Sequence, residues 1–491
     1  MVEKYDFLII GAGVVGSAIA RELSKYEAKV LVLEKECDVC FGTSGRNSGV
    51  SHAGFYMPPG SLKAKLNVLG NKLMPGLCKE LDVPFKEIGK LVVAKNEDEI
   101  SYLEKLKSQG EKNGVKGLKL IDSREIKKLE PEVNGVAALY SRHSGILDPF
   151  ELTIALAENA LENGVEIKLK HEVTDIAVRE NFFEVKTTKG SFRAEWLINS
   201  AGLFADEIAK LVGIHSYRIY PCRGEYHVLD KNHSNLVSML IYPVPPLESG
   251  GLGVHLTPTV HGNLMLGPSA EYISDKEDFS TSRDVMEELI REAKEMVPKI
   301  EKASVIRSFA GIRPKLVPKG KAFADFVIKE EEKVEKFINL VGIESPGLTA
   351  APAIAKMVVE LIKEKQELKR KKVFKARRKR PRRFYELNDA ERKKLVKKDK
   401  RYAEIICRCE LVTRKEIIDA WKNPLGARSL NSIKLRTRAG MGRCQGSFCL
   451  PRILEVLEEE FGFEALNLTL SCDDSRLFSD YSRKSLGKDE S

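Results

Sequence analysis

The sequence predicts an α/β fold of two or three domains, and three observations lead to that prediction. The chain opens with an apolar run of strand length, residues 6–10, followed directly by a glycine turn and a helical pattern. A second apolar run, residues 29–33, follows this pattern, as in the nucleotide-binding half of a Rossmann-like sheet. Four cysteines lie in two close pairs near the other end of the 491 residues, which predicts a separate small domain.

The composition, and the absence of a recognisable secretory signal or membrane span, predict a globular protein. Hydrophobic residues make up 43% of the chain and charged residues 31%, enough for several cores. The first residues show neither a basic start nor a long apolar stretch, so we expect no secretory signal. No window approaches the roughly 20 apolar residues of a membrane span. The sequence therefore predicts a cytoplasmic protein without a transmembrane segment, whose membrane contact would be peripheral and through a partner.

A basic segment separates the two ends of the chain. Residues 363–401 hold 20 Lys or Arg against 6 Asp or Glu and so carry +14, whereas the whole chain carries +10. Clustered cations attract phosphates, so nucleic acid or anionic lipid is one interpretation of this run. No base-stacking aromatics or nucleic-acid module accompany the charges. We therefore expect a solvated interdomain linker and no nucleic-acid partner.

The glycine turn is suited to a dinucleotide. Gly11 permits the tight turn, Gly13 lets the backbone approach a pyrophosphate, and Gly16 lets helix and strand pack closely. Glu34 ends the second strand, close to the separation at which an acid meets ribose hydroxyls. The turn alone does not distinguish NAD from FAD.

The segment 41–54, Phe-Gly-Thr-Ser-Gly-Arg-Asn-Ser-Gly-Val-Ser-His-Ala-Gly, carries a family resemblance. It resembles the flavin-contacting segment of the D-amino-acid-oxidase-like flavoenzymes, in particular glycerol-3-phosphate and L-2-hydroxyglutarate dehydrogenases. Residues 145–149, 171–173, 196–206 and 341–349 are similar to further nucleotide-binding or helix-entry segments of this superfamily. The resemblance implies that the cofactor is FAD. The positions it assigns to FAD are Gly11, Ala12, Gly13, Gly16, Glu34, Lys35, Thr43, Ser44, Asn47, Ser48, Val173 (through its main chain), Ala201, Gly202, Gly311, Gly342, Gly347, Leu348 and Thr349.

The same resemblance implies the domain order. Residues 221–226, 242–245 and 253–258 are similar to antiparallel substrate-domain strands of these dehydrogenases. A Rossmann-like FAD-binding domain is then interleaved with an antiparallel β-sheet substrate domain, and a small helical iron-sulfur domain follows. The expected boundaries are 1–80, 145–215 and 305–365 for the FAD-binding domain, 81–144 and 216–304 for the substrate domain, 366–401 for the basic linker, 402–465 for the [2Fe-2S] domain and 466–491 for a C-terminal tail.

Three residues are candidates for substrate chemistry. Arg313 directly precedes a proline, which favours an extended backbone, and its planar fork of donors suits a phosphate or carboxylate. The matching arginine of the family binds the anionic group of the substrate. Hydride transfer to flavin also requires a base for the hydroxyl proton, and His52 is the first choice, with His255 second. Alternative roles for His52 are packing on the flavin or carrying it covalently.

The C-terminal cysteines supply four thiolates in two pairs: Cys407 with Cys409, and Cys444 with Cys449. Their spacing fits either an iron-sulfur cluster or a structural zinc. The segment resembles the bacterioferritin-associated-ferredoxin-like [2Fe-2S] domain. It is most similar to the version at the C-terminus of the catalytic subunit of anaerobic glycerol-3-phosphate dehydrogenases, which shares the four-residue gap of the final pair. A cluster implies onward electron transfer, so we expect an electron-accepting subunit or a quinone-linked partner.

Together these features predict a dehydrogenase for a small anionic 2-hydroxy substrate, with an acceptor other than NAD or oxygen. Glycerol 3-phosphate, oxidised to dihydroxyacetone phosphate in glycerol metabolism, is the leading substrate because the appended cysteine domain matches that family. L-2-hydroxyglutarate is the alternative, because the flavin segment and substrate strands match equally well. A hypothesis of another class is a flavin and iron-sulfur redox sensor that binds nucleic acid through the basic segment.

Overall fold

The computed structural model describes residues 3–245, 252–320 and 323–480. Its residues group into two compact units: unit 1, residues 1–35 and 39–380, and unit 2, residues 36–38 and 381–491. Residues 481–491 of the expected tail lie outside the described residues. Within the described part of the chain, no helix is both long and apolar enough to cross a membrane.

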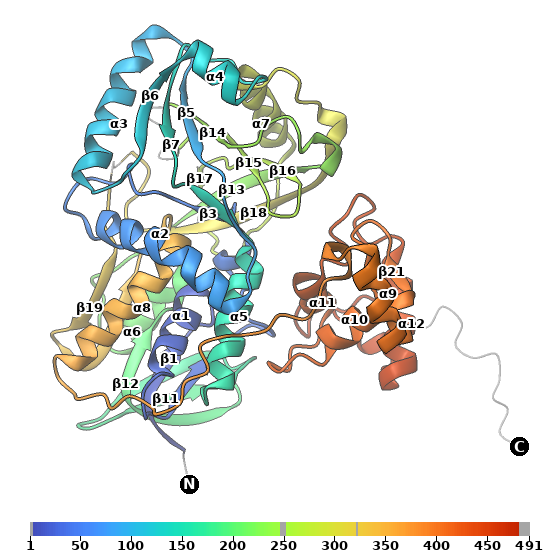
Figure 1. The fold of residues 1–491 in the computed structure, drawn as a ribbon. Helices are drawn as coiled ribbons and strands as arrows, with labels where there is room; N and C mark the ends of the chain where they lie inside the picture. The colour runs from blue at the N-terminus through green and yellow to red at the C-terminus, as the bar shows by residue number, and fades with distance from the viewer. Residues whose placement is uncertain (1–2, 246–251, 321–322, 481–491) are drawn as a thin grey trace, which may run out of the picture. The chain divides into compact units, whose positions relative to one another are not determined.

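An eight-stranded sheet forms one end of unit 1 (Figure 1). Its centre is a row of parallel strands in the order β9-β2-β1-β12-β20, and the β10–β11 hairpin and β19 pair antiparallel at its sides. Parallel strands joined by helices give the expected Rossmann-like arrangement. The strands are β1 (Lys4–Ile10), β2 (Val30–Leu33), β9 (Glu166–Lys168), β10 (Val173–Val178), β11 (Phe183–Thr187), β12 (Gly190–Asn199), β19 (Val327–Glu331) and β20 (Val334–Val341).

Helices cover this sheet because each presents an apolar stripe to it. In Figure 1, α1, α5 and α8 lie together against the sheet, and α1 packs on both of the other two. The long helix α2 packs on α8 and crosses toward the other end of unit 1. The bounds are α1 (Val14–Leu23), α2 (Leu62–Leu81), α5 (Pro149–Glu162), α6 (Ala205–Leu211) and α8 (Gly347–Lys363).

A nine-stranded sheet with α3, α4 and α7 forms the other end of unit 1 (Figure 1). Its strands run antiparallel except for the parallel pair β5 and β14. The elements are β5 (Lys90–Ala94), α3 (Ile100–Lys112), β6 (Leu118–Asp122), α4 (Ser123–Leu129), β7 (Ala137–Ser141), β13 (Tyr220–Leu229), β14 (Leu240–Pro243), β15 (His255–Pro258), β16 (Leu264–Gly267), β17 (Glu271–Tyr272), α7 (Arg283–Met296) and β18 (Val305–Lys315).

The strand β18 belongs to this second sheet, because it pairs along its whole length with β13. Residues 305–365 are expected in the FAD-binding domain, but the first part of this range, β18, pairs with β13 of the nine-stranded sheet instead. A partner strand some 90 residues earlier in the sequence decides which sheet β18 joins, and no local motif reveals that partner. A third, small antiparallel sheet joins β3 (Val50–Ser51), β8 (Gly145–Leu147) and β4 (Phe85–Glu87).

Unit 2 is a small helical domain with one short hairpin, as expected. Its core consists of buried apolar side chains from the hairpin and from α10, α11 and α12, among them Ile406, Ile417, Ile433 and Ile453. A capping box between Thr413 and Glu416 begins α10. The bounds are α9 (Asp389–Lys398), β21 (Ile405–Cys407), β22 (Val412–Thr413), α10 (Arg414–Trp421), α11 (Leu430–Thr437) and α12 (Cys449–Phe461).

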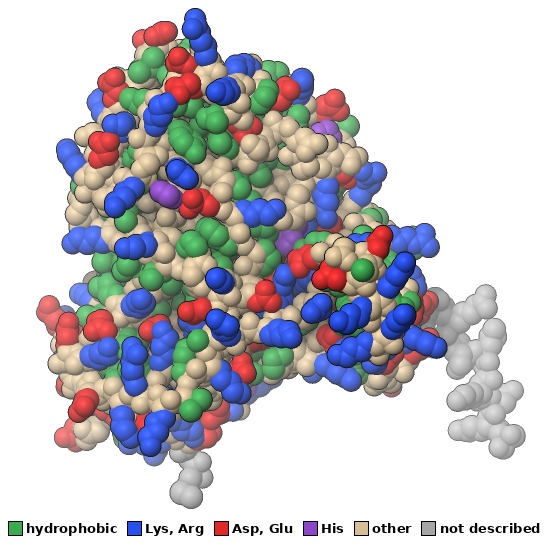
Figure 2. All heavy atoms as spheres, viewed as in Figure 1, with side chains coloured by type: hydrophobic (Ala, Val, Ile, Leu, Met, Phe, Trp, Pro, Cys, Tyr) green, Lys and Arg blue, Asp and Glu red, His purple; other side chains and the backbone are tan. Residues whose placement is uncertain are grey.

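The basic segment is bonded to unit 1 over part of its length. The carbonyl oxygen of Lys369 accepts the backbone N–H of Glu27 at 2.8 Å, and Arg378 pairs with Glu158 at 2.7 Å. Residues 369–380 are therefore not a solvated linker. Their basic side chains pair with acidic residues of unit 1, and their backbone hydrogen-bonds to the backbone of unit 1. Residues 389–398 form α9 of unit 2. On the face drawn in Figure 2, Lys and Arg side chains lie interspersed with Asp and Glu.

Candidate active site and cofactor-binding residues

The first glycine turn is shaped by close backbone contacts. Gly11 has φ +97°, and a Cβ at Gly16 would lie 2.0 Å from the Gly11 carbonyl oxygen, so neither position tolerates a side chain. Gly13 is the N-cap residue of α1 and has no capping side chain of its own, and no acid lies in the first turn. The hydroxyl of Ser44 accepts the N–H of Val14 at 2.9 Å. The turn thus presents backbone amides without a negative charge of its own, as a pyrophosphate requires.

Glu34 lies directly beside this turn. Its carboxylate accepts the N–H of Ala12 at 2.6 Å, and its carbonyl oxygen accepts the N–H of His171 at 2.8 Å. The side chain of Lys35 makes other contacts. Its amine pairs with Glu277 at 2.6 Å and lies over the ring of Phe204. We therefore keep Glu34 as a candidate ribose contact and find no support in these contacts for Lys35.

The segments around Val173 and Ala201 border the same turn. The His171 contact places the start of β10, at Val173, next to the end of β2. The hydroxyl of Ser200 donates to the carbonyl oxygen of Ile10 at 2.8 Å, which holds Ala201 and Gly202 at the end of β1. The structure therefore brings together the glycine turn and both later segments.

The segment 43–49 meets β18 and is stiffened by its own side chains. Thr43 donates its hydroxyl to the carbonyl oxygen of Ile312 at 2.9 Å, and a Cβ at Gly311 would lie 2.0 Å from the Arg46 carbonyl oxygen. The Asn47 amide donates to the Ser44 carbonyl oxygen at 2.7 Å and accepts the N–H of Gly49 at 2.9 Å. Ser48 lies within hydrogen-bonding reach of the Tyr226 hydroxyl.

The N-terminus of α8 completes this surface. Gly342 has φ +73°, and Gly347 begins α8, whose first turn also has neither an acid nor a side-chain cap. Leu348 follows and is half-buried. Thr349 accepts the N–H of His52 at 3.0 Å and donates its hydroxyl to Val50 at 3.2 Å, which ties α8 to the segment before His52.

These residues fit FAD. Two helix N-termini without acidic residues suit its negatively charged pyrophosphate and the charge of its reduced flavin. Glycines at the close approaches leave room for a cofactor against the backbone. The expected positions are partly exposed along the turn and in the segment 43–48, where the neighbouring strand residues are buried.

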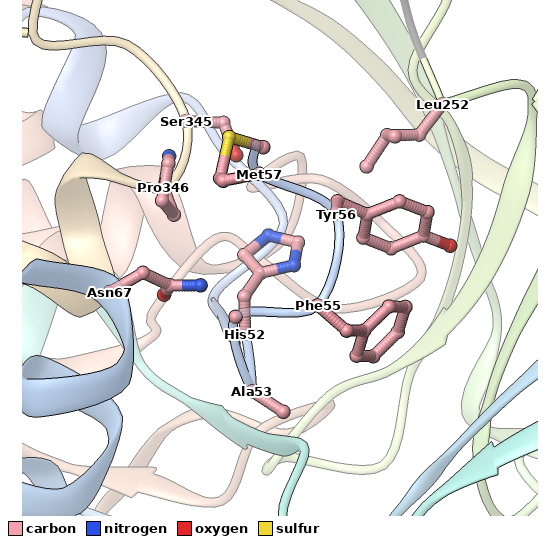
Figure 3. Close-up of a pocket in the computed structure, with 10 residues that line it drawn as sticks. His52, Ala53, Phe55, Tyr56, Met57, Asn67, Leu252, Ser345 and Pro346 are labelled. Carbon is pink, nitrogen blue, oxygen red and sulfur yellow. The ribbon is translucent and has the colours of Figure 1, made fainter. Parts of the chain in front are cut away.

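His52 lies in the middle of the residues that line a pocket, between Tyr56 and Asn67 (Figure 3). The amide of Asn67, in the orientation that satisfies both of its polar atoms, donates to the His52 carbonyl oxygen at 3.1 Å. It also accepts the N–H of Gly54 at 3.0 Å. Together with Thr349, this buried amide fixes the backbone of His52 from α2 and α8. The other lining residues are Ala53, Gly54, Phe55, Met57, Leu252, Ser345 and Pro346.

A buried lysine contacts the ring of His52. Lys90, at the start of β5, places its Nζ 3.3 Å from the Nδ1 of His52. The same Nζ lies 3.7 Å from the ring centroid of Tyr242, and Tyr242 stacks on His255 with centroids 3.8 Å apart. His52 and His255, the two histidines selected from the sequence, therefore belong to one cluster with Lys90 and Tyr242.

Both histidines of this cluster are neutral bases near pH 7. Burial, reinforced by Lys90 and His255, holds the pKa of His52 well below its usual value. Burial likewise lowers the pKa of His255 to about 3. The Nδ1 of His255 lies 2.9 Å from the carbonyl oxygen of Gly253, an acceptor, so this nitrogen carries the ring proton.

Arg313 is held by carbonyl oxygens rather than by acids. Its guanidinium donates to the backbone of Cys222 at 3.3 Å, of Arg223 at 3.2 Å and of Ser269 at 2.6 Å. Among the described residues, no carboxylate forms an ion pair with it. Arg313 also lies close enough to lower the pKa of His255. A positioned guanidinium without a paired carboxylate, near the neutral imidazole of His255, can hold the anionic group of a substrate.

Four of the cysteines of unit 2, Cys407, Cys409, Cys444 and Cys449, form two thiol pairs. Cys409 and Cys444 lie 3.9 Å apart, and Cys407 is hydrogen-bonded to Cys449. The hydrogen bond from Cys449 lowers the pKa of Cys407, and the backbone amides of Gly440 and Glu410 act in the same direction.

All four cysteines are free of disulfides. Within the described ranges, no three His, Cys, Asp or Glu side chains converge on one metal position. A [2Fe-2S] cluster needs two thiolate ligands for each of its two irons. The two thiol pairs therefore fit such a cluster. A Cβ at Gly442 would lie 2.2 Å from the Cβ of Cys409, so the loop around the exposed pair requires this glycine.

Sequence reasoning missed two residues of the active site. Lys90 is a charged residue at the head of a strand, Lys90–Ala94, that is otherwise apolar, and such a lysine in a buried strand could have attracted attention. Asn67 lies on α2 and belongs to no recognised motif, so it gave no signal. Neither could be connected with His52 without the fold.

Comparison with known proteins agrees with this geometry. Residues 6–361 match the sequence model of the FAD dependent oxidoreductases (DAO), and residues 405–459 match the BFD-like [2Fe-2S] binding domain. A glycerol 3-phosphate dehydrogenase of Caloramator mitchellensis is 44% identical over 94% of this chain and 95% of its own. The mitochondrial L-2-hydroxyglutarate dehydrogenase of Arabidopsis thaliana is 35% identical over 72% of this chain and 83% of its own.

A solved structure extends the comparison to three dimensions. The dithionite-reduced L-α-glycerophosphate oxidase of Mycoplasma pneumoniae with FAD bound has a TM-score of 0.73 and 35% identity. The match covers 77% of this chain and all of that one. The cofactors of the present protein are accordingly FAD and a [2Fe-2S] cluster. With a match that spans most of its length, the chain belongs to the family of FAD-dependent oxidoreductases.

Proposed function

We propose that the protein oxidises glycerol 3-phosphate to dihydroxyacetone phosphate and passes the electrons on through its [2Fe-2S] cluster. The observation that carries this proposal is the guanidinium of Arg313, which carbonyl oxygens hold in place beside His255 without a compensating carboxylate. A phosphate ester binds such a fork through two oxygens. The relative of the same name at 44% identity supports the choice of substrate.

In the proposed reaction, Arg313 binds the phosphate and His52 accepts the proton of the C2 hydroxyl at its Nε2. This nitrogen makes no hydrogen bond with a described residue, whereas Nδ1 contacts Lys90. His52 is uncharged near pH 7 and therefore able to accept a proton. His255 is the second candidate for this role. FAD, when bound, supplies the two-electron acceptor for the hydrogen at C2.

The cluster gives the electrons a path away from FAD. Cys407, Cys409, Cys444 and Cys449 are the proposed ligands, and the pairwise contacts of their thiols support this assignment. A one-electron carrier after a two-electron cofactor suits an acceptor other than NAD or oxygen. We propose a protein subunit or a quinone-linked partner as that acceptor.

L-2-hydroxyglutarate is the second candidate substrate, because relatives of that name match the oxidoreductase part of the chain. Its carboxylate would bind Arg313 in place of the phosphate. The match to the Arabidopsis relative covers 72% of this chain, whereas the match to the glycerol 3-phosphate dehydrogenase covers 94%. The longer match favours glycerol 3-phosphate.

Anaerobic stopped-flow mixing with each candidate substrate tests this proposal. The purified protein, loaded with FAD and iron, should lose its flavin absorbance rapidly with glycerol 3-phosphate and slowly or not at all with L-2-hydroxyglutarate. Cluster bleaching should follow flavin bleaching. Rapid reduction by L-2-hydroxyglutarate alone would reverse the assignment, and reduction by neither compound would remove both substrates.

A further inference from the structure

Lys90 occupies an unusual position for a charged residue. Its side chain is fully buried, and its backbone pairs with β14 on one side and β7 on the other. Its Nζ contacts the Nδ1 of His52 at 3.3 Å. In the part of the chain that the structure describes, no carboxylate pairs with it, and burial is the influence that acts on its charge.

Three aromatic rings and the imidazole of His52 lie around the amine. Nζ faces the rings of Tyr242 at 3.7 Å, Tyr56 at 5.4 Å and Phe55 at 5.7 Å. The titratable or charged groups of this cluster are His52, His255, Tyr56 and Tyr242, with Tyr102, Tyr226 and Arg313 acting on them from farther away. The aromatic faces attract an ammonium, whereas burial disfavours it.

The contact between Lys90 and His52 links two protonation states. An ammonium has three donors and no acceptor, so a charged Lys90 requires Nδ1 to be the acceptor and places the proton of a neutral imidazole on Nε2. An Nε2 that already carries a proton cannot take one from a substrate. An uncharged amine, in contrast, can accept the Nδ1–H, and the lone pair is then on Nε2.

We propose that Lys90 is the positioning residue of His52: its uncharged amine accepts the Nδ1–H of the imidazole and thereby keeps the Nε2 lone pair available to the substrate hydroxyl. This inference rests on the proposed role of His52. When Nε2 takes the hydroxyl proton, Nδ1 gives its own proton to Lys90, which becomes an ammonium. C2 of the substrate is oxidised, and its hydrogen leaves with two electrons to bound FAD. The proton thus stays on the cluster and the hydride goes to FAD, and charge and atoms balance over the substrate, the cluster and the cofactor together.

The charges of the cluster support this assignment. Burial lowers the pKa of Lys90 from 10.5 to about 7, so its amine changes charge near neutrality. Burial raises the pKa values of Tyr56 and Tyr242, and both phenols stay protonated in the same range. The pKa values of His52 and His255 are both lowered. Lys90 is therefore the member of this cluster that titrates at working pH.

Two substitutions separate positioning from simple attraction of the substrate anion. Lys90→Arg keeps a permanent cation that only donates, so we expect the rate of FAD reduction to fall on the order of 100-fold with little change in substrate affinity. Lys90→Met removes both the donor and the acceptor, and we expect its rate of FAD reduction to fall less than that of Lys90→Arg, by about 10-fold. A near-normal Lys90→Arg enzyme, together with weakened substrate binding in Lys90→Met, would overturn the proposal.

The imidazole itself provides a readout that needs no substrate. Long-range ¹H–¹⁵N spectra of the FAD-loaded protein labelled at histidine nitrogens distinguish a protonated Nδ1 from a protonated Nε2, and His52→Gln identifies the signals. From about pH 6 to about pH 8.5, the His52 proton should move from Nε2 to Nδ1 while the ring remains neutral. In Lys90→Met the tautomer should not change across this range. A wild-type tautomer that stays fixed would refute the inference.

The two measurements also separate this inference from the proposed function. If glycerol 3-phosphate fails to reduce FAD but the tautomer shifts with pH, the substrate assignment fails and the role of Lys90 remains. If reduction is rapid and pH-independent, and the tautomer does not shift, the function remains and Lys90 is a structural residue.

Discussion

At the scale of single residues, the proposed binding of the substrate anion rests on the charge of Arg313. Its guanidinium is oriented by three carbonyl oxygens, so its charge remains available to a ligand. Arg313→Ala should raise the glycerol 3-phosphate concentration for half-maximal FAD reduction by about 30-fold to 1000-fold, the cost of removing one partner of a close charge pair. Bound FAD should keep its absorbance.

Two further variants control this prediction. Arg313→Lys should recover part of the affinity, because it restores the charge without the planar fork. Arg291→Ala removes an exposed arginine that pairs with Glu288 on α7 and should leave the kinetics unchanged. Equal effects of the substitutions at 313 and 291 would show that overall charge, and not a built site, attracts the substrate.

The burial of Lys90 also predicts how stability depends on pH. Because its pKa is about 7 in the folded state and 10.5 in the unfolded state, the unfolded chain binds more protons between these values. The contribution of Lys90 to the free energy of unfolding therefore rises with pH across this window, by about 5 kcal/mol in total. The melting temperature of the wild type relative to Lys90→Met should increase from pH 7 upward. A constant difference would mean that Lys90 remains charged in the folded protein.

At the scale of elements, the contact between α2 and α8 positions the active site. Gly70 of α2 lies against the first turn of α8, where an added Cβ would be 2.1 Å from the Thr349 carbonyl oxygen. Thr349 in turn holds the N–H of His52. Gly70→Ala should push the helices apart, lower the free energy of unfolding by about 1 to 3 kcal/mol and reduce the fraction of protein that retains FAD.

The same helix offers a matched control. Gly76 is exposed on α2, and nothing lies within 4 Å of a Cβ added there. Gly76→Ala should therefore raise the free energy of unfolding by about 0.5 to 1 kcal/mol through its better helix propensity. Thermal melts and FAD content of both variants check the prediction, and similar effects at the two positions would contradict it.

The elements that could be predicted from the sequence are those with local signals. The turn from Gly11 to Gly16 has its strand, glycines and helix within a few residues, so its structure and its ligand class followed from the sequence. The sheet to which β18 belongs could not be predicted, because its partner β13 is distant in the chain. The contact of Lys90 with His52 likewise depends on how β5 lies against the loop after β3. The need for a base suggested His52 and the family resemblance suggested the role of Arg313, whereas only the fold placed Lys90 beside His52.

At the scale of the whole molecule, the chain divides its chemistry between two units. The residues that fit FAD and the proposed substrate lie in unit 1, and the four cysteines lie in unit 2. Damage to the cluster should therefore spare the first half of the reaction. Cys409→Ser removes a member of the more exposed thiol pair and should abolish the visible absorbance of the cluster.

The rates of the two half-reactions test this division. In Cys409→Ser, anaerobic reduction of FAD by glycerol 3-phosphate should stay within about twofold of the wild type, because the substitution changes none of the residues that fit FAD or the substrate. Steady-state turnover with a one-electron acceptor should fall to a small fraction, since the electrons lose their path from FAD. Cys472→Ser, which changes another cysteine of unit 2, should keep both the cluster absorbance and the turnover. Normal turnover in Cys409→Ser would mean that electrons leave FAD without passing through the cluster, and loss of FAD reduction would mean that the two units do not act independently.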